Sequence, residues 1–148
     1  MAEGEIGFLG LGAMGGPITA RLAAWAQRHP GRRILAYDPR PEALAAAAAA
    51  GAEPVPGGTR DMAERCALIL ACLPAPEISE AVALGPEGIA AVPRDRRKVT
   101  TYVEMSTIGS AAMRGLADRL AGHGITLVDS PISGGECFRA RIVSQDTA

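Results

Sequence analysis

Three glycines near the start of the chain have the spacing of a phosphate-binding loop. The stretch GFLGLGAMGGPI carries glycine at the first, third and sixth positions of GLGAMG. In such a loop the first glycine allows a tight turn, the second lets backbone approach a pyrophosphate, and the third lets a helix pack closely on a strand. The unpaired N–H groups and the positive end of the helix favour phosphates. The pattern predicts that a dinucleotide binds at Gly10, Leu11, Gly12, Ala13, Met14 and Gly15.

An acidic residue lies where a ribose-binding carboxylate is expected. Asp38 follows Gly15 by 23 residues and ends the apolar stretch RILAYD, and the usual spacing is about 20 residues. A carboxylate accepts a hydrogen bond from a free 2′-hydroxyl and repels a 2′-phosphate, which favours NAD. Arg40 is either a solvated loop charge or a partner for adenine or a 2′-phosphate. We therefore expect NAD or NADP as cofactor, with a modest preference for NAD.

Apolar stretches of strand length alternate with helical patterns along the chain. Helix signals include a proline in the first turn and a glycine after the last one. Strands that are uniformly apolar and separated by helices are typical of a parallel sheet. We predict an α/β fold, a doubly wound, mostly parallel Rossmann-type sheet with helices on both faces. The expected strands lie near residues 5–9, 33–38, 53–55, 67–74, 100–106 and 125–130, and the expected helices near 15–28, 41–51, 61–65, 76–84 and 109–123.

Composition excludes several classes of function. With 148 residues, 48% hydrophobic content and a formal net charge of −1, the chain fits one domain with a buried core. The near-neutral charge gives no reason to expect nucleic acid or an anionic membrane as a partner. No apolar run reaches the roughly 18 to 20 residues that cross a bilayer. Cys66, Cys72 and Cys137 lack metal-ligand spacing, and the start has no signal-peptide pattern. We expect a cytoplasmic protein without a metal site.

Four motifs in chain order resemble the β-hydroxyacid dehydrogenase family. They are GFLGLGAMGGPI, ACLP, VEMSTIG and DSPISGG, and together they span residues 5–135. The family includes 3-hydroxyisobutyrate dehydrogenase and the larger 6-phosphogluconate dehydrogenases. The resemblance implies that residues 1–135 form the NAD(P)-binding domain of an oxidoreductase. Such an enzyme transfers a hydride between nicotinamide and a small 3-hydroxy acid or semialdehyde.

The same resemblance implies roles for individual residues. Leu73 and Pro74 match the turn after the fourth strand, which runs along the cofactor. Thr107 matches the residue whose neighbourhood holds the nicotinamide ribose. A serine followed by two glycines matches the loop that receives the substrate carboxylate, and it exposes N–H groups without side-chain obstruction. The residues of this loop are Ser133, Gly134 and Gly135.

The chain departs from the family after this loop. Residues 136–148 read ECFRARIVSQDTA and form an atypical C-terminal tail where the family has a stretch rich in glycine and alanine. Family members also carry a second, all-helical domain with a catalytic lysine in the pattern GxxGxGxxxKxxxN. The lysine of this chain, Lys98, lies in RDRRK and matches nothing in that helix. We expect the helical domain to be absent, with no catalytic residue assigned, and the chain to be truncated and catalytically incomplete.

Two functions follow from these expectations. The first is the cofactor domain of a dehydrogenase, whose substrate is a small carboxylate if the chain is active. The alternative is a non-catalytic dinucleotide-binding or sensor module that works with another chain. In either case, the surface left by the missing helical domain offers a route to self-association.

Overall fold

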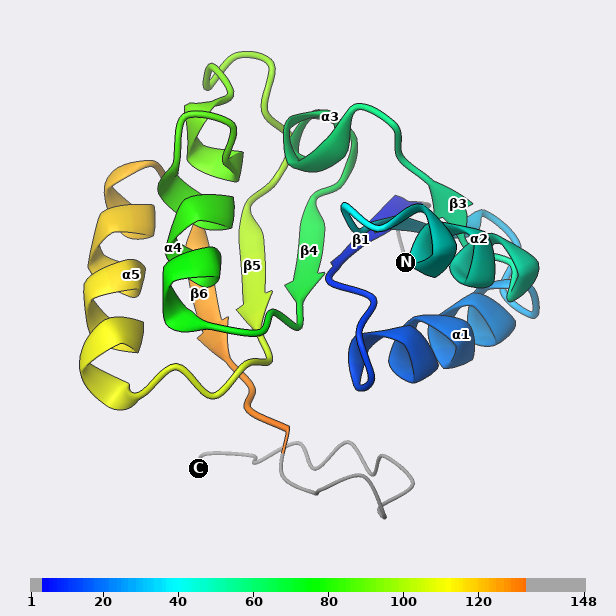
Figure 1. Ribbon diagram of the computed structural model, residues 1–148. Helices are drawn as coiled ribbons and strands as arrows, with labels where there is room; N and C mark the ends of the chain where they lie inside the picture. Colours follow the sequence, from blue (N-terminus) through cyan, green and yellow to red (C-terminus); the bar gives the residue numbers. More distant parts are fainter. Residues whose placement is uncertain (1–3, 133–148) are drawn as a thin grey trace, which may run out of the picture.

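The computed structural model describes residues 4–132, which form a six-stranded parallel sheet flanked by helices (Figure 1). The strand order is β3-β2-β1-β4-β5-β6, and every neighbouring pair is parallel. The order changes direction between β1 and β4, and in open α/β sheets a ligand crevice lies beyond the carboxyl ends of the strands at such a point. The strands are β1 (Gly4–Leu9), β2 (Arg32–Tyr37), β3 (Glu53–Pro54), β4 (Leu68–Ala71), β5 (Thr101–Glu104) and β6 (Thr126–Asp129).

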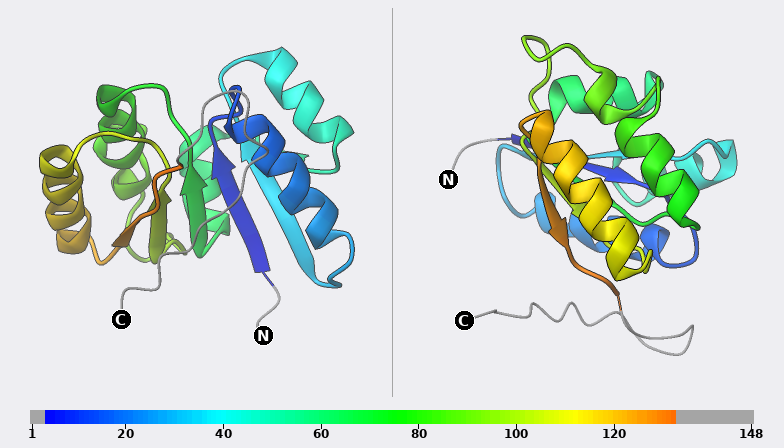
Figure 2. Two further views of the ribbon diagram at one scale, coloured as in Figure 1. Left: turned by 90° about the horizontal axis from the view of Figure 1, so that it is seen from below. Right: turned by 90° about the vertical axis from the view of Figure 1, so that its left-hand side faces the viewer.

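The helices begin and end close to the residues that the sequence signals predict. Pro41 and Pro76 stand in the first turns of α2 and α4, where a missing N–H costs little. Figure 2 shows α1 and α2 toward one end of the sheet and α4 and α5 toward the other. The helices are α1 (Gly15–Ala26), α2 (Pro41–Ala49), α3 (Gly58–Arg65), α4 (Pro76–Leu84) and α5 (Ser110–Gly122), with a short 3₁₀ helix, η1 (Ile89–Ala91), after α4.

Two hydrophobic cores lie on the two faces of the sheet. Successive strand residues point to opposite faces, so Phe8 and Ile34 pack with α1 while Leu9 and Leu35 belong to the core under α3, α4 and α5. Tyr102 of β5 is fully buried in the second core. The predicted doubly wound arrangement, with helices on both faces, is therefore confirmed.

One expectation about burial is wrong for the last strand. The apolar strands were expected to be covered on both faces, but Val128 of β6 is 41% exposed. Val128 pairs with Val103, which contacts the core on the α1 face. Helix α1 contacts β1 and β2, whereas β6 is the strand at the far edge of the sheet.

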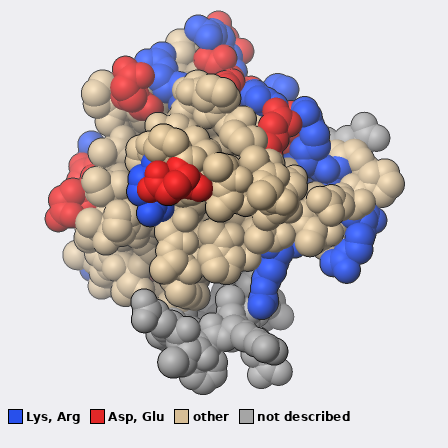
Figure 3. Space-filling view, turned by 45° about the vertical axis from the view of Figure 1, so that its right-hand side comes forward, with Lys and Arg blue, Asp and Glu red and all other residues tan. Residues whose placement is uncertain are grey.

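Charged side chains tie the amino ends of the first strands together. Arg65 of α3 makes ion pairs with Glu5 at 2.9 Å and with Glu53 at 2.8 Å, and Arg33 pairs with the same two carboxylates. Hydrogen bonds from Arg65, which outweigh the opposing effect of burial, lower the pKa of the Glu5 carboxyl. Acidic and basic side chains are also interspersed along the upper edge of the face drawn in Figure 3. No helix within residues 4–132 has the length and hydropathy needed to cross a membrane.

A buried hydroxyl on α4 generates a prediction about stability. Ser79 is fully buried, and its Oγ has no hydrogen-bond partner among the residues that the structure describes. We expect Ser79→Ala to raise the free energy of unfolding by about 1 kcal/mol, because an unpaired buried hydroxyl costs about 1–3 kcal/mol and alanine favours a helix. Denaturant unfolding measures the change. The exposed Ser110→Ala serves as control, and a less stable Ser79→Ala protein would contradict the interpretation.

Candidate functional site

A cavity of about 780 Å³ lies beyond the carboxyl ends of β1, β2 and β4. Its walls come from the loop between β1 and α1, the end of β2, the turn after β4 and one side of α4. This is the position expected for a ligand at the change of strand order. Of the residues predicted to bind a cofactor, Gly10, Gly12, Ala13, Met14, Gly15, Asp38, Arg40, Leu73 and Pro74 line the cavity.

The glycine loop is held against the sheet by backbone contacts. Gly10 has a φ of 87°, and a Cβ atom there would lie 2.1 Å from the Cys72 carbonyl oxygen. A Cβ atom on Gly15 would lie 1.9 Å from the Gly10 carbonyl oxygen. These two glycines are therefore required by close approach of the backbone.

Gly12 has the opposite environment. A Cβ atom built on Gly12 would meet no atom within 4 Å, because this residue faces the open cavity. Its carbonyl accepts a hydrogen bond from the Gly16 N–H at 2.9 Å, which starts the first turn of α1. The space above Gly12 and the helix N-terminus behind it suit the close approach of a phosphate.

The Asp38 carboxylate connects the glycine loop to the end of β2. The Leu11 N–H donates to Oδ2 of Asp38 at 2.8 Å. Leu11, which was predicted to bind the cofactor, is buried and does not line the cavity. Its N–H points to Asp38, whereas its neighbours Gly10 and Gly12 line the cavity. The Asp38 carboxylate thus holds the loop from the adjacent strand, together with the Tyr37 carbonyl, which accepts a hydrogen bond from the Gly10 N–H at 3.0 Å.

Arg40 binds the same carboxylate. Its backbone N–H and its Nε–H both donate to Oδ1 of Asp38 at 2.9 Å, and Nη2 donates to Oδ2 at 3.0 Å. With the bond from Leu11, four donors meet a group that has about four acceptor positions. The Asp38 carboxylate is 6% exposed, whereas the Arg40 side chain is 52% exposed. A ribose hydroxyl that approached Asp38 would therefore compete with the Arg40 side chain.

These hydrogen bonds set the charge of Asp38. Burial alone would raise the pKa of its carboxyl, but the hydrogen bonds from Arg40 and Leu11 outweigh burial and lower the pKa to about 2. Asp38 is therefore ionised at neutral pH. Because the pKa is lowered on folding, the stabilisation is present above about pH 4 and is lost as the pH falls toward 2.

The rest of the cavity wall includes residues that the motifs did not indicate. Ile78, Ala81 and Val82 present one side of α4 to the cavity, and Ile78 is 43% exposed there. The (i, i+3, i+4) spacing of these residues marks a helix face and was the signal available in the sequence. Further lining residues are Leu9, Tyr37, Pro39, Thr59, Cys72 and Glu87.

The structure does not place Thr107 at the cavity and does not describe the predicted substrate loop. Thr107 is exposed and does not line the cavity, although it follows Ser106 directly in the predicted motif. The predicted substrate loop, Ser133, Gly134 and Gly135, lies outside the described residues. The roles assigned to all four residues stay predictions.

Among residues 4–132, Cys72 is the cysteine that lines the cavity. Burial, with a smaller contribution from Glu104, raises the pKa of Cys72. A thiol with a raised pKa stays protonated and is a poor nucleophile. Within residues 4–132 no three side chains of the metal-binding types come together.

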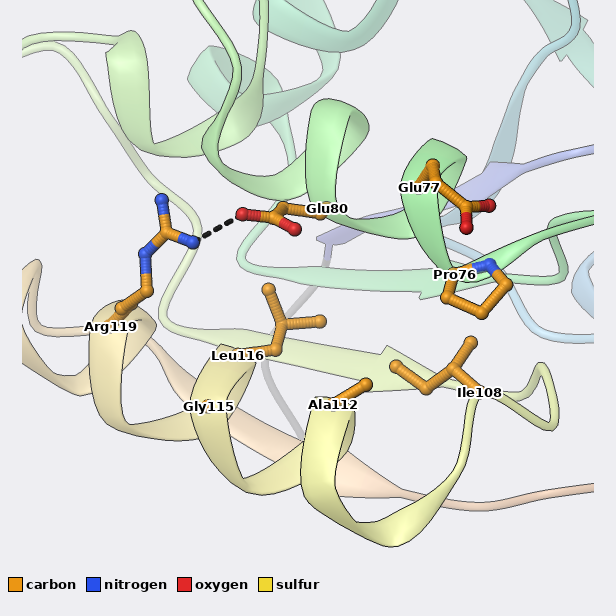
Figure 4. Close-up of a pocket in the computed structure, with 8 residues that line it drawn as sticks. All are labelled: Pro76, Glu77, Glu80, Ile108, Ala112, Gly115, Leu116 and Arg119. Carbon is orange, nitrogen blue, oxygen red and sulfur yellow. Dashed lines mark hydrogen bonds and ion pairs between the residues drawn. The ribbon is translucent and has the colours of Figure 1, made fainter.

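A second hollow of about 250 Å³ lies between α4 and α5. Figure 4 shows Glu80 of α4 facing Arg119 of α5 at one end of it, where the two side chains form an ion pair. Ile108 and Leu116 form its apolar floor. Glu77 and Glu80 line this hollow, whereas Ile78, Ala81 and Val82 line the larger cavity, so the two cavities lie against different sides of α4.

Comparison with known proteins identifies relatives for this fold and site. The chain is 32% identical over 131 residues to the 3-hydroxyisobutyrate dehydrogenase of Pseudomonas aeruginosa, covering 88% of this chain and 41% of that protein. It is also 32% identical to the L-threonate dehydrogenase of Cupriavidus necator, with the same two coverages. The chain thus spans less than half the length of these relatives.

Solved structures agree with this relationship. The 3-hydroxyisobutyrate dehydrogenase of Mycobacterium tuberculosis, solved with L-serine, superimposes with a TM-score of 0.73 at 28% identity. The match covers 91% of this chain and 42% of that structure. The family model described as the NAD binding domain of 6-phosphogluconate dehydrogenase matches residues 5–140. The resemblance predicted from the four motifs is therefore confirmed, and the chain belongs to this family of NAD-binding domains.

Proposed function

We propose that the 780 Å³ cavity binds an NAD or NADP dinucleotide. The pyrophosphate would lie over Gly12 and the N-terminus of α1, and the adenosine ribose beside Asp38 and Arg40. The nicotinamide half would lie toward Leu73 and Pro74, because the β4–β5 half of the sheet forms the second mononucleotide unit. The observation that carries this proposal is that one cavity joins the open face of Gly12, the end of β2 and the turn after β4.

We further propose that this domain serves an oxidoreductase that acts on a small 3-hydroxy acid or semialdehyde. The names of the relatives support this, since they are dehydrogenases of 3-hydroxyisobutyrate and L-threonate. The bound nicotinamide supplies the hydride chemistry. The residues of this chain hold the dinucleotide, orient it on the glycine loop and cover one side of it with the apolar face of α4.

Lys98 does not lie where it could transfer a proton at this cavity. Lys98 precedes β5 and hydrogen-bonds through its backbone to Ala63, at the amino ends of the strands. The cavity lies at the carboxyl ends, so Lys98 is not a general acid for a substrate there. Loss of general acid–base catalysis lowers a rate by about 10²- to 10⁴-fold. We therefore propose that the chain by itself binds dinucleotide but turns over substrate poorly.

Titration with NADH and NADPH tests this function. We expect the fluorescence of at least one of them to change on binding with micromolar affinity, because the cavity and glycine loop are already formed. A parallel assay with 3-hydroxyisobutyrate and NAD or NADP measures turnover. Absence of micromolar affinity for both nucleotides would refute the cofactor proposal. Efficient turnover would overturn the proposal of poor catalysis.

Substitution of Gly12 separates binding from folding. We expect Gly12→Ala to weaken dinucleotide binding about tenfold, since a methyl group forced into a close contact costs about 1–3 kcal/mol. The stability should change little, because the added Cβ meets no protein atom within 4 Å. Gly115→Ala is the matched control, since its Cβ also meets no atom within 4 Å and it lies on α5. Equal nucleotide affinity of the Gly12→Ala and Gly115→Ala proteins would contradict the placement of the pyrophosphate.

Arg40 sets the balance between NAD and NADP in our proposal, in which NAD is modestly preferred. Arg40→Ala removes a partner for a 2′-phosphate and frees the Asp38 carboxylate for a ribose hydroxyl. We expect the ratio of NADPH to NADH dissociation constants to rise about tenfold, as for the loss of a charge-assisted hydrogen bond. The exposed Arg28→Ala serves as control. A ratio that stays unchanged or falls in Arg40→Ala would show that Arg40 does not face the 2′ position.

A further inference from the structure

A set of hydrogen bonds links the ends of β4 and β5 beneath the cavity. The Leu73 N–H donates to Ser106 Oγ at 2.7 Å. The Ser106 N–H in turn donates to the Glu104 carboxyl at 3.0 Å. Glu104 is fully buried and Ser106 is 8% exposed. Neither residue lines the cavity, but the hydrogen bond to Ser106 connects them to Leu73, which does.

The Ser106 hydroxyl continues the sheet where backbone pairing ends. The Cys72 N–H still bonds to the Leu9 carbonyl of β1 at 2.9 Å, and the Met105 N–H bonds to the Ala71 carbonyl at 2.8 Å. The next donor on the β5 side is the Leu73 N–H, and it is accepted by a side chain instead of a carbonyl. The Leu73 end of this turn is therefore held by the side chain of a serine 33 residues away in the sequence.

This turn borders the glycine loop directly. A Cβ atom on Gly10 would lie 2.1 Å from the Cys72 carbonyl oxygen and 3.1 Å from the Leu73 side chain. Leu73 and Pro74 also form the cavity wall on the β4 side. A shift of the turn would therefore move the part of the wall that lies farthest along the sheet from Asp38, which stands at the end of β2.

We propose that Ser106, oriented by Glu104, is a positioning residue for the nicotinamide half of the bound dinucleotide. The inference rests on the proposed function, because it assumes a dinucleotide in the cavity. It adds a residue outside the glycine loop and assigns it to one half of the ligand. The adenosine half is held near Asp38 and Arg40, so Ser106 does not contribute to its binding.

A comparison of NADH with ADP tests this assignment. ADP carries the adenosine and both phosphates but no nicotinamide half. We expect Ser106→Ala to weaken NADH binding about tenfold, because the turn at Leu73 loses the acceptor that holds it and must be ordered when the nucleotide binds. ADP binding should change less than about twofold. Ser106→Thr, which keeps the hydroxyl, should restore NADH affinity. NADPH replaces NADH if the wild-type protein binds it more tightly.

The controls separate this role from general damage to the fold. Ser110→Ala removes an exposed serine in the same region and should leave both affinities unchanged. If Ser106→Ala does not fold, Ser106→Cys, with a weak acceptor of similar size, should show the same selective loss. Equal losses for ADP and NADH, or no loss for either, would overturn the proposal. Failure of the wild-type protein to bind either reduced nucleotide would instead refute the proposed function itself, and this inference with it.

Discussion

The hydrogen bond from the Leu11 N–H to the Asp38 carboxylate is the contact on which the site depends. Together with the bond from the Gly10 N–H to the Tyr37 carbonyl at 3.0 Å, it fixes the glycine loop to the end of β2. It also holds a negative charge at the wall of the cavity. The carboxylate accepts four hydrogen bonds, and these bonds lower its pKa to about 2. In our proposal, loop geometry and cofactor selectivity are therefore coupled through one side chain, and we expect a change at Asp38 to alter both.

Much of the fold could be predicted because its signals are local. The bounds of α4 agree with the predicted 76–84, since a proline and a glycine flank the helix. Helix α3 begins at Gly58, earlier than the predicted residue 61, because glycines at positions 57 and 58 are typical of a loop. The short η1 was not predicted, since three residues show no periodicity. The exposure of Val128 depends on how far α1 reaches across the sheet, which no local pattern encodes.

The candidate site also has features that could be predicted from local sequence and features that could not. The glycine spacing and Asp38 lie within one βαβ unit, so their proximity follows from the chain order. The engagement of Asp38 by Arg40 was not predicted, because it depends on a rotamer choice at an exposed side chain. The bond from Leu73 to Ser106 joins the ends of two strands that only the sheet brings together. Such contacts can be identified only when the register of the strands and the directions of the side chains are known.

The backbone contacts of the glycine loop have a consequence for suppressor genetics. The atoms that exclude a side chain at Gly10 and Gly15 are carbonyl oxygens of Cys72 and Gly10, which every amino acid carries. No second-site substitution can remove them, so a lesion at either glycine has no simple compensating partner. At Gly7, by contrast, the obstruction comes from side chains, chiefly Met62 at 2.5 Å from a built Cβ, with Ile69 at 3.2 Å. A smaller residue at position 62 would make room there, so revertants of a Gly7 lesion should map to α3.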